Sequence, residues 1–261
     1  MLALIALCVA ALPAFAASKV TAFVLDDGVV HRARRVWIYE PAESAASPDA
    51  KFGLLVLLDG DSYREELGAP ALLDALIATK AIPPLIAVMV DNSEARLEEL
   101  ANRERFATHL AKELVPWVRT HYRISANADD VAIGGASAGG LAAAYVAFRH
   151  PEVFHRVLSQ SGAFWRGNEG ASSPGEWLTE QFRSAPKLPL QFSIEVGALE
   201  TSKVVNGVVF LEANRRLRDV LLAKGYRVDY VEVPNATHGE AQWRAALPDA
   251  LAKLFSATDR R

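Results

Sequence analysis

The chain has 261 residues, of which 51% are hydrophobic, and its formal net charge is −3 at pH 7. A chain of this length and apolar content can bury the core of one domain without disulfide bonds. The near-neutral charge excludes the strongly basic surface that is typical of nucleic-acid-binding domains, so we expect no nucleic-acid partner.

The N-terminus has the pattern of a secretory leader. Residues 2–12 are almost wholly apolar, and Pro13-Ala14-Phe15-Ala16 supplies the small residues of a cleavage site. The apolar run is too short to span a membrane, which takes about 20 residues. We therefore predict that residues 1–17 are removed on export, and that residues 18–261 form one periplasmic or secreted domain without a membrane span. No Lys or Arg precedes the apolar run, so a retained N-terminal anchor is the alternative.

The one cysteine of the chain, Cys8, lies inside this leader. After cleavage the domain would have no disulfide, no thiol nucleophile and no thiolate metal ligand. Because no metal-binding pattern such as HExxH is present either, we expect neither a metal nor an organic cofactor.

From residue 18 onward, the hydrophobic pattern alternates between strands and helices. Short apolar runs and alternating segments predict strands, in chain order, at Val20–Leu25, Val36–Tyr39, Phe52–Leu58, Leu85–Val90, Val131–Ile133, Val157–Leu158, Leu190–Val196 and Val228–Val233. Helical spacing predicts helices at Ala69–Lys80, Phe106–Tyr122, Gly139–Arg149, Val208–Lys224 and Gln242–Phe255. Residues 41–49 are predicted as a polar turn, and the region that holds Trp165 and Trp177 as a loop. The alternation predicts an α/β fold with a mostly parallel central sheet and helices on both faces.

The segment Gly135-Ala136-Ser137-Ala138-Gly139 lies between a predicted strand and a predicted helix. In an α/β-hydrolase fold, a sharp turn at this place exposes the serine oxygen, and the glycines avoid collisions with the neighbouring strand and helix. A Gly-rich packing turn or a phosphate-binding loop is the alternative, but neither Gly-Lys-Ser/Thr nor GxGxxG fits here. The motif therefore predicts the α/β-hydrolase fold with Ser137 as nucleophile.

A serine nucleophile needs a general base, because its hydroxyl hardly ionises at neutral pH. In this fold the base lies in the loop after the last strand, which is Pro234-Asn235-Ala236-Thr237-His238-Gly239. The other histidines lie near strands or in helices, at His31, His109, His121, His150 and His155. We therefore predict that His238 is the base.

The acid of the triad should follow the penultimate strand and orient the imidazole. Glu195 lies inside that predicted strand, whereas Glu200 lies beyond its end. The position beyond the strand favours Glu200, and Glu195 is the alternative.

Two backbone N–H groups should hold the oxyanion of the tetrahedral intermediate. The amide of Ala138, next to the nucleophile, is the first. The loop Asp59-Gly60-Asp61-Ser62-Tyr63, after the first buried parallel strand, should supply the second, and we predict the amide of Asp61. A plain turn at Asp59-Gly60 is the alternative.

With these residues placed, the chain resembles the enterochelin (enterobactin) esterase-like family, within the esterase D group of α/β-hydrolases. The similarity covers about residues 52–255. It rests on Leu57-Leu58-Asp59-Gly60, Asn102-x-x-x-Phe106 with Glu113-Leu114-x-Pro116-Trp117, Gly134 to Leu141, Phe154 with Leu158 to Trp165, and His238 with Trp243. The resemblance implies a serine esterase that uses Ser137 and His238, with Trp165 and Arg166 lining the substrate cleft. Some members work with a Ser–His pair alone, so the resemblance leaves the role of Glu200 open.

Taken together, the residues and the resemblance predict an exported esterase that hydrolyses a carboxylic ester through an acyl-enzyme. The substrate would be a small molecule, a siderophore-type or other aryl or acyl ester. Acyl transfer to a sugar or lipid hydroxyl by the same site is one alternative, and a non-catalytic binding protein is another. The fold does not decide among substrates, because one fold carries many functions. The sequence makes no prediction of oligomeric state.

Overall fold

The computed structural model describes residues 17–27, 32–47, 49–91, 96, 103–167, 175–204 and 207–256. The predicted leader as far as Ala16 lies outside these residues, as do His31 and Asn102. The predictions that concern them stay predictions.

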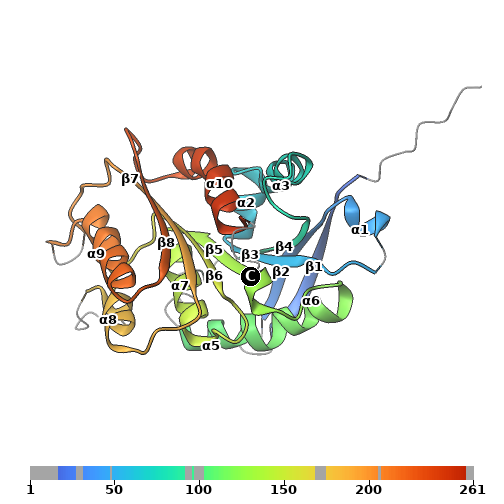
Figure 1. The fold of residues 1–261 in the computed structure, drawn as a ribbon, viewed down its shortest axis with the longest axis horizontal. Coiled ribbons are helices and arrows are strands. Elements are labelled where there is room, and N and C mark those ends of the chain that lie inside the picture. Colours follow the sequence, from blue (N-terminus) through green and yellow to red (C-terminus); the bar gives the residue numbers. More distant parts are fainter. Residues whose placement is uncertain are drawn as a thin grey trace, which may run out of the picture.

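Eight strands form a sheet in the order β1-β2-β4-β3-β5-β6-β7-β8 (Figure 1). They are β1 (Lys19–Asp27), β2 (Arg32–Glu40), β3 (Gly53–Leu58), β4 (Leu85–Val90), β5 (Val131–Ala136), β6 (Arg156–Gln160), β7 (Gln191–Gly197) and β8 (Arg227–Val233). β2 pairs antiparallel with both β1 and β4, and every other pair of neighbours is parallel. The predicted, mostly parallel sheet is confirmed.

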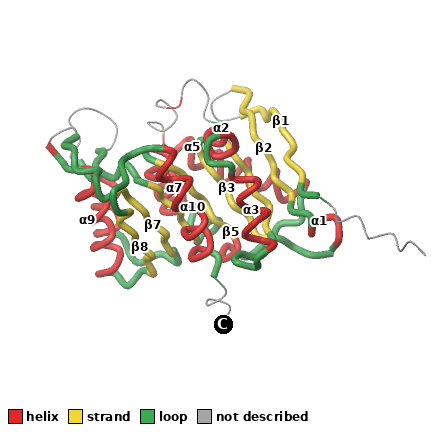
Figure 2. The backbone as a smooth tube through the Cα atoms, turned by 90° about the horizontal axis from the view of Figure 1, so that it is seen from above, coloured by secondary structure: helices red, strands yellow, loops and turns green. Residues whose placement is uncertain are grey.

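The described residues also form helices, listed here with their bounds: α1 (Glu43–Ala46), α2 (Gly60–Glu65), α3 (Ala69–Ala78), α5 (Arg103–His109), α6 (Val115–His121), α7 (Ala138–Arg149), α8 (Trp177–Ser184), α9 (Phe210–Ala223) and α10 (Glu240–Leu254). α2, α3 and α10 lie over one face of the sheet, and α5 to α9 lie over the other (Figures 1 and 2). None of these helices is long and apolar enough to cross a membrane.

The apolar side chains on both sides of the strands explain why helices pack on both faces of the sheet. Along β3, Leu54, Val56 and Leu58 pack into the core beneath α5 to α9, whereas Leu55 and Leu57 pack into the core beneath α2, α3 and α10. Successive side chains of a strand point to opposite faces, so a continuous apolar run requires helices on both sides. The sequence predicted this arrangement from the same run.

The long helix predicted at 106–122 is divided in the structure. α5 is followed by a π-helical turn at Leu110–Leu114, and α6 then begins at Val115. Pro116 lies in the first turn of α6, and a proline has no N–H to donate to the carbonyl four residues earlier. The wider π turn, in which Val115 N–H bonds to Leu110 O, accommodates the proline without ending the helix.

Three further helices form where the sequence predicted turns or loops. α1 lies in the predicted turn at 41–49, and α8 begins at Trp177 in the predicted loop region. α2 begins at Gly60, directly after β3, in the segment predicted to be the second oxyanion loop. These short helices carry too few periodic positions for a sequence pattern to separate them from loops.

The register of the sheet brings the predicted site to one edge. Ala136 at the end of β5 pairs with Gln160 of β6, which in turn pairs with Glu195 of β7. Gly197 at the end of β7 pairs with Val233 at the end of β8. The loops after these four parallel strands therefore leave the sheet side by side, at the carboxyl edge where open α/β sheets bind ligands.

Candidate active site

Ser137 occupies a strained turn between β5 and α7. Its backbone has φ 54° and ψ −118°, a combination that a residue with a side chain rarely adopts. Two hydrogen bonds hold the turn: Ser137 N–H donates to Gln160 O at 2.8 Å, and Ser137 O accepts from Ala163 N–H at 2.9 Å. The nucleophile elbow predicted from the motif is therefore present in the backbone.

The glycines of the elbow are needed because β5 and α7 pass very close to each other. A Cβ atom on Gly135 would lie 2.6 Å from the backbone carbon of Gly139. We expect Gly135→Ala to force the strand and helix apart and to lower the free energy of unfolding by about 1–3 kcal/mol, the usual cost of overpacking. Urea unfolding of the variant checks this, and an unchanged midpoint would contradict it.

The structure brings the three predicted triad residues together. His238 Nε2 lies 3.0 Å from Ser137 Oγ, and His238 Nδ1 lies 2.7 Å from Glu200 Oε2. Ser137 follows β5, Glu200 follows β7, and His238 follows β8. The alternative acid, Glu195, hydrogen-bonds instead to Gln160 in the interior.

The environment of Glu200 keeps its carboxyl group ionised. Burial alone raises the pKa of Glu200, but hydrogen bonds from His238, Ser161 and the Gly197 N–H outweigh burial and hold this pKa below its usual value of 4.5. An ionised carboxylate can only accept, so His238 Nδ1 donates to it and Nε2 is left to accept the proton of Ser137. The arrangement suits general-base activation of the serine.

The imidazole is also held by two aromatic rings. His238 meets Phe210 with ring centroids 4.8 Å apart and Trp243 with centroids 5.1 Å apart, edge to face in both cases. Its side chain is still 37% exposed, whereas that of Glu200 is 2% exposed. The His238 imidazole is thus accessible from solvent, and the Glu200 carboxylate is not.

A pocket of about 300 Å³ opens beside Ser137. Its lining comes from α2 and its flanks, Arg96, the elbow, the His238 loop and the start of α10. The residues are Asp59, Ser62, Tyr63, Leu67, Arg96, Ala136, Ser137, His238, Glu240 and Trp243. The Arg96 guanidinium binds both oxygens of the Asp59 carboxylate, and this hydrogen bonding raises the pKa of Arg96. The pocket therefore places Ser137 and His238 next to the Arg96–Asp59 ion pair.

The remaining predicted site residues, Ala138, Asp61, Trp165 and Arg166, are not among the residues that line this pocket. Ala138 is the first residue of α7, and Asp61 lies in the first turn of α2 with its carboxylate turned toward Arg64 at 3.4 Å. Trp165 is half-buried against the core, and the Arg166 guanidinium lies 5.5 Å from its ring centre. The oxyanion roles of Ala138 and Asp61 and the substrate contacts of Trp165 and Arg166 stay predictions.

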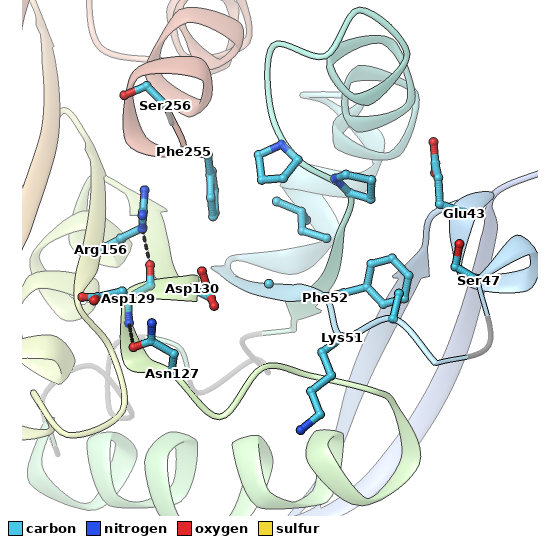
Figure 3. A pocket seen from close by; sticks show the side chains of 15 residues that line it. Glu43, Ser47, Lys51, Phe52, Asn127, Asp129, Asp130, Arg156, Phe255 and Ser256 are labelled. Carbon is cyan, nitrogen blue, oxygen red and sulfur yellow. Dashed lines mark hydrogen bonds between the residues drawn. The ribbon is translucent and has the colours of Figure 1, made fainter. Parts of the chain in front are cut away.

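A larger cavity, of about 590 Å³, lies at the opposite edge of the sheet (Figure 3). Gly53 and Leu85, which begin β3 and β4, are among its lining residues. Arg156 at this cavity donates to the backbone oxygens of Asp129 and Leu254. The described residues that line this cavity include no histidine that could act as a base. Nor does any group of three or more His, Cys, Asp or Glu side chains in the described part of the chain have the placement to hold a metal ion.

Sequence reasoning missed a buried polar chain beneath the site. Tyr63 donates its hydroxyl to Gln160 Oε1 at 2.7 Å, and Gln160 Nε2 donates to Glu195 Oε1 and to Trp243 O. Burial raises the pKa of Glu195 to about 8, and the hydrogen bond from Gln160 opposes this rise without cancelling it. The signal in the sequence was Ser159-Gln160-Ser161, three polar residues directly after the apolar pair Val157-Leu158.

The raised pKa of Glu195 predicts a pH-dependent stability. Between about pH 4.5 and pH 8 the folded state keeps a proton on Glu195 that the unfolded state has released. Stability therefore falls as pH rises through this range, by at most about 1.4 kcal/mol per pH unit from this group. We expect Glu195→Gln to remove this dependence of the unfolding free energy on pH. The unfolding free energy of the variant should therefore rise relative to that of the wild type from pH 5 to pH 8. Urea unfolding of both proteins at each pH measures the difference, and a constant difference would contradict the assignment.

Comparison with known proteins shows the family of most of the chain. Residues 28–254 match the family described as “Putative esterase”. The chain belongs to this Esterase family.

The iron(III) salmochelin esterase of Escherichia coli O6:H1 is 30% identical over 237 residues, which cover 87% of this chain and 55% of the relative. The iron(III) enterobactin esterase of Escherichia coli K12 is 33% identical over 228 residues, which cover 86% of this chain and 54% of the relative. The Esterase-family chain thus spans about half the length of these curated relatives.

Solved structures agree with the family. The enterobactin esterase of Shigella flexneri, crystallised in the presence of enterobactin, has a TM-score of 0.78 at 26% identity, over 90% of this chain and 58% of that one. The S-formylglutathione hydrolase of Staphylococcus aureus has a TM-score of 0.72 at 15% identity, over 95% of this chain and 100% of that one, and so shares the fold. The resemblance to enterochelin esterase-like proteins and the α/β-hydrolase fold predicted for this Esterase-family chain are confirmed.

Proposed function

We propose that this Esterase-family chain is a serine esterase that hydrolyses a carboxylic ester through an acyl-enzyme. The observation that carries the proposal is the hydrogen-bonded series from Ser137 Oγ through the His238 ring to Glu200, over 3.0 and 2.7 Å. The series lies at a strained elbow, on the edge of the sheet where this fold binds its ligands.

In the first half of the reaction, Ser137 Oγ bonds to the ester carbonyl carbon while His238 Nε2 takes the hydroxyl proton. Glu200 stabilises the imidazolium that results. The carbonyl oxygen becomes an oxyanion, and the amides of Ala138 and Asp61 are its proposed donors. When the carbonyl re-forms, the bond to the leaving alcohol oxygen breaks, His238 gives the proton to that oxygen, and the acyl group stays on Ser137.

In the second half, water takes the place of the alcohol. His238 Nε2 removes one proton from the water as its oxygen bonds to the acyl carbon. The proton then returns to Ser137 Oγ as the bond between this oxygen and the acyl carbon breaks. One ester and one water thus yield one acid and one alcohol, and the enzyme is unchanged.

We extend the proposal to siderophore-type esters as the substrate. Two relatives that are 30% and 33% identical are named for salmochelin and enterobactin hydrolysis. The pocket beside Ser137 carries the Arg96–Asp59 ion pair, which suits a substrate rich in polar oxygens. Trp165 and Arg166 are the proposed contacts for its aromatic groups, because aromatic and guanidinium planes stack on aromatic rings.

We also propose that the reaction takes place outside the cytoplasm. The support is the apolar stretch at residues 2–12 and the small residues that follow it. Mass spectrometry of the N-terminus of protein recovered from the periplasm tests this, and we expect it to begin after Ala16 or Ala17. An intact N-terminus in the cytoplasm would contradict export.

An ester panel tests the catalytic proposal. The wild-type protein is assayed with p-nitrophenyl acetate, a feruloyl ester, and enterobactin with and without iron, and a fluorophosphonate probe reports a reactive serine. We expect turnover of esters and labelling at Ser137. Absence of both would contradict the esterase, whereas turnover of the simple esters without that of enterobactin would contradict the siderophore substrate alone.

A further inference from the structure

A second serine, Ser161, lies at the end of the strand next to that of the nucleophile. β6 ends at Gln160, which pairs with Ala136 at the end of β5, so Ser161 leaves β6 where Ser137 leaves β5. Ser161 is fully buried and has φ 47°, in a region that favours glycine. A serine in such a strained backbone conformation indicates that its side chain has a structural or functional role.

The Ser161 hydroxyl hydrogen-bonds to Glu200, Gln242 and Trp243. Its Oγ lies 2.6 Å from Glu200 Oε1, 3.2 Å from Gln242 Nε2 and 3.1 Å from Trp243 Nε1. A hydroxyl has one proton to donate and two lone pairs that accept. The indole N–H of Trp243 can only donate, and an ionised carboxylate can only accept. The amide of Gln242 and the indole of Trp243 therefore donate to Ser161 Oγ, and the hydroxyl proton points to Glu200.

This fixed hydroxyl determines how the Glu200 carboxylate is oriented. Oε1 accepts from Ser161 Oγ and from the Gly197 N–H at 2.8 Å, while Oε2 faces His238 Nδ1 at 2.7 Å. The two hydrogen bonds to Oε1 fix the plane of the carboxylate, and this plane determines the direction in which Oε2 points. Trp243, which anchors Ser161, also packs against the His238 ring at 85°. α10 thus supports the base directly and the acid through Ser161.

We infer that Ser161 is a positioning residue, which aims the Glu200 carboxylate at His238 and does not touch the substrate. The inference rests on the esterase function proposed above. It predicts an effect on the chemical step that passes entirely through Glu200, with no effect on substrate binding.

The test begins with two replacements of Ser161. Ser161→Ala removes the hydroxyl, and Ser161→Gly removes it while suiting the positive φ, so the Gly variant stands in if the Ala variant does not fold. We expect both to lower kcat for p-nitrophenyl acetate by about 10- to 100-fold, the range for one hydrogen bond to a charged group, with KM unchanged. If the residue only shapes the backbone, Ser161→Gly should instead keep the wild-type kcat.

Ser159→Ala is the matched control. Ser159 is also a fully buried serine of this segment, two residues before Ser161, and its hydroxyl has no hydrogen-bond partner among the described residues. We expect the wild-type kcat from this variant. A loss equal to that of Ser161→Ala would show that any buried serine of this segment matters and would overturn the inference.

A double-mutant cycle with Glu200→Gln decides whether Ser161 acts through Glu200. Once Glu200→Gln has removed the carboxylate, we expect Ser161→Ala to cause no further loss of kcat. The same loss in both backgrounds would overturn the inference, as would a wild-type kcat for Ser161→Ala.

A readout without substrate separates this inference from the proposed function. In the wild type, the proton on His238 Nδ1 should give a downfield NMR resonance because of its bond to Glu200, and Ser161→Ala should shift or broaden it. If the wild type shows neither turnover nor fluorophosphonate labelling, the proposed function fails, and this resonance still tests the positioning role. A resonance that is unchanged in Ser161→Ala would overturn that role.

Discussion

Ser137→Ala is expected to lower kcat for p-nitrophenyl acetate by about 10⁶-fold, the loss found when the serine of such a triad is removed. The variant keeps the elbow and His238 but has no oxygen to bond to the ester carbon. No acyl-enzyme can form, so labelling by a fluorophosphonate should also disappear. Steady-state kinetics and mass spectrometry of the labelled protein measure both effects.

Two controls make this result specific. Thermal unfolding should show that Ser137→Ala folds as the wild type does, and Ser159→Ala should keep the wild-type kcat and its labelling. If Ser137→Ala still hydrolysed the ester at more than a trace of the wild-type rate, the nucleophile would be another residue, and the proposed mechanism would be wrong.

Glu200→Gln is expected to lower kcat by about 10⁴-fold, as removal of the acid does in related triads. The amide N–H₂ of glutamine can donate to His238 Nδ1, which favours the tautomer with its proton on Nε2. That tautomer cannot accept the proton of Ser137. KM should change little, because Glu200 is buried behind His238 and is not among the residues that line the pocket.

Glu195→Gln is the matched control for this experiment. Both glutamates are buried, and they lie five positions apart, but Glu195 contacts Gln160 and Glu200 contacts His238. We expect Glu195→Gln to keep kcat near that of the wild type. The reverse outcome, a large loss for Glu195→Gln and a small one for Glu200→Gln, would assign the acid to the other glutamate.

The contrast between these glutamates follows from their hydrogen-bond donors. Burial opposes ionisation of both. Glu200 receives hydrogen bonds from His238, Ser161 and the Gly197 N–H, and its pKa falls below 4.5. The hydrogen bond from Gln160 does not outweigh burial at Glu195, and its pKa rises to about 8. At neutral pH one carboxyl group is therefore an ion that can stabilise an imidazolium, and the other is a neutral acid within the core.

The sequence by itself determined the parts of this protein that depend on local pattern. Apolar runs of strand length required a sheet that is covered on both faces. The Gly135–Gly139 segment required a sharp turn because no side chain fits between β5 and α7. Chain order then placed His238 in the loop after the last strand. These features depend on residues that are close together in the sequence or on the order of elements, so a sequence pattern can predict them.

Only the tertiary structure decided which buried polar groups meet. The sequence left Glu195 as an alternative to Glu200, and only the structure shows that the loop after β7 brings Glu200 to His238. The sequence predicted no role for Ser161, because its partners come from the β7–α9 loop and from α10 and are 39 to 82 positions away. Hydrogen bonds depend on distances of a few tenths of an ångström and on direction, and these are set only when separate elements pack around one core.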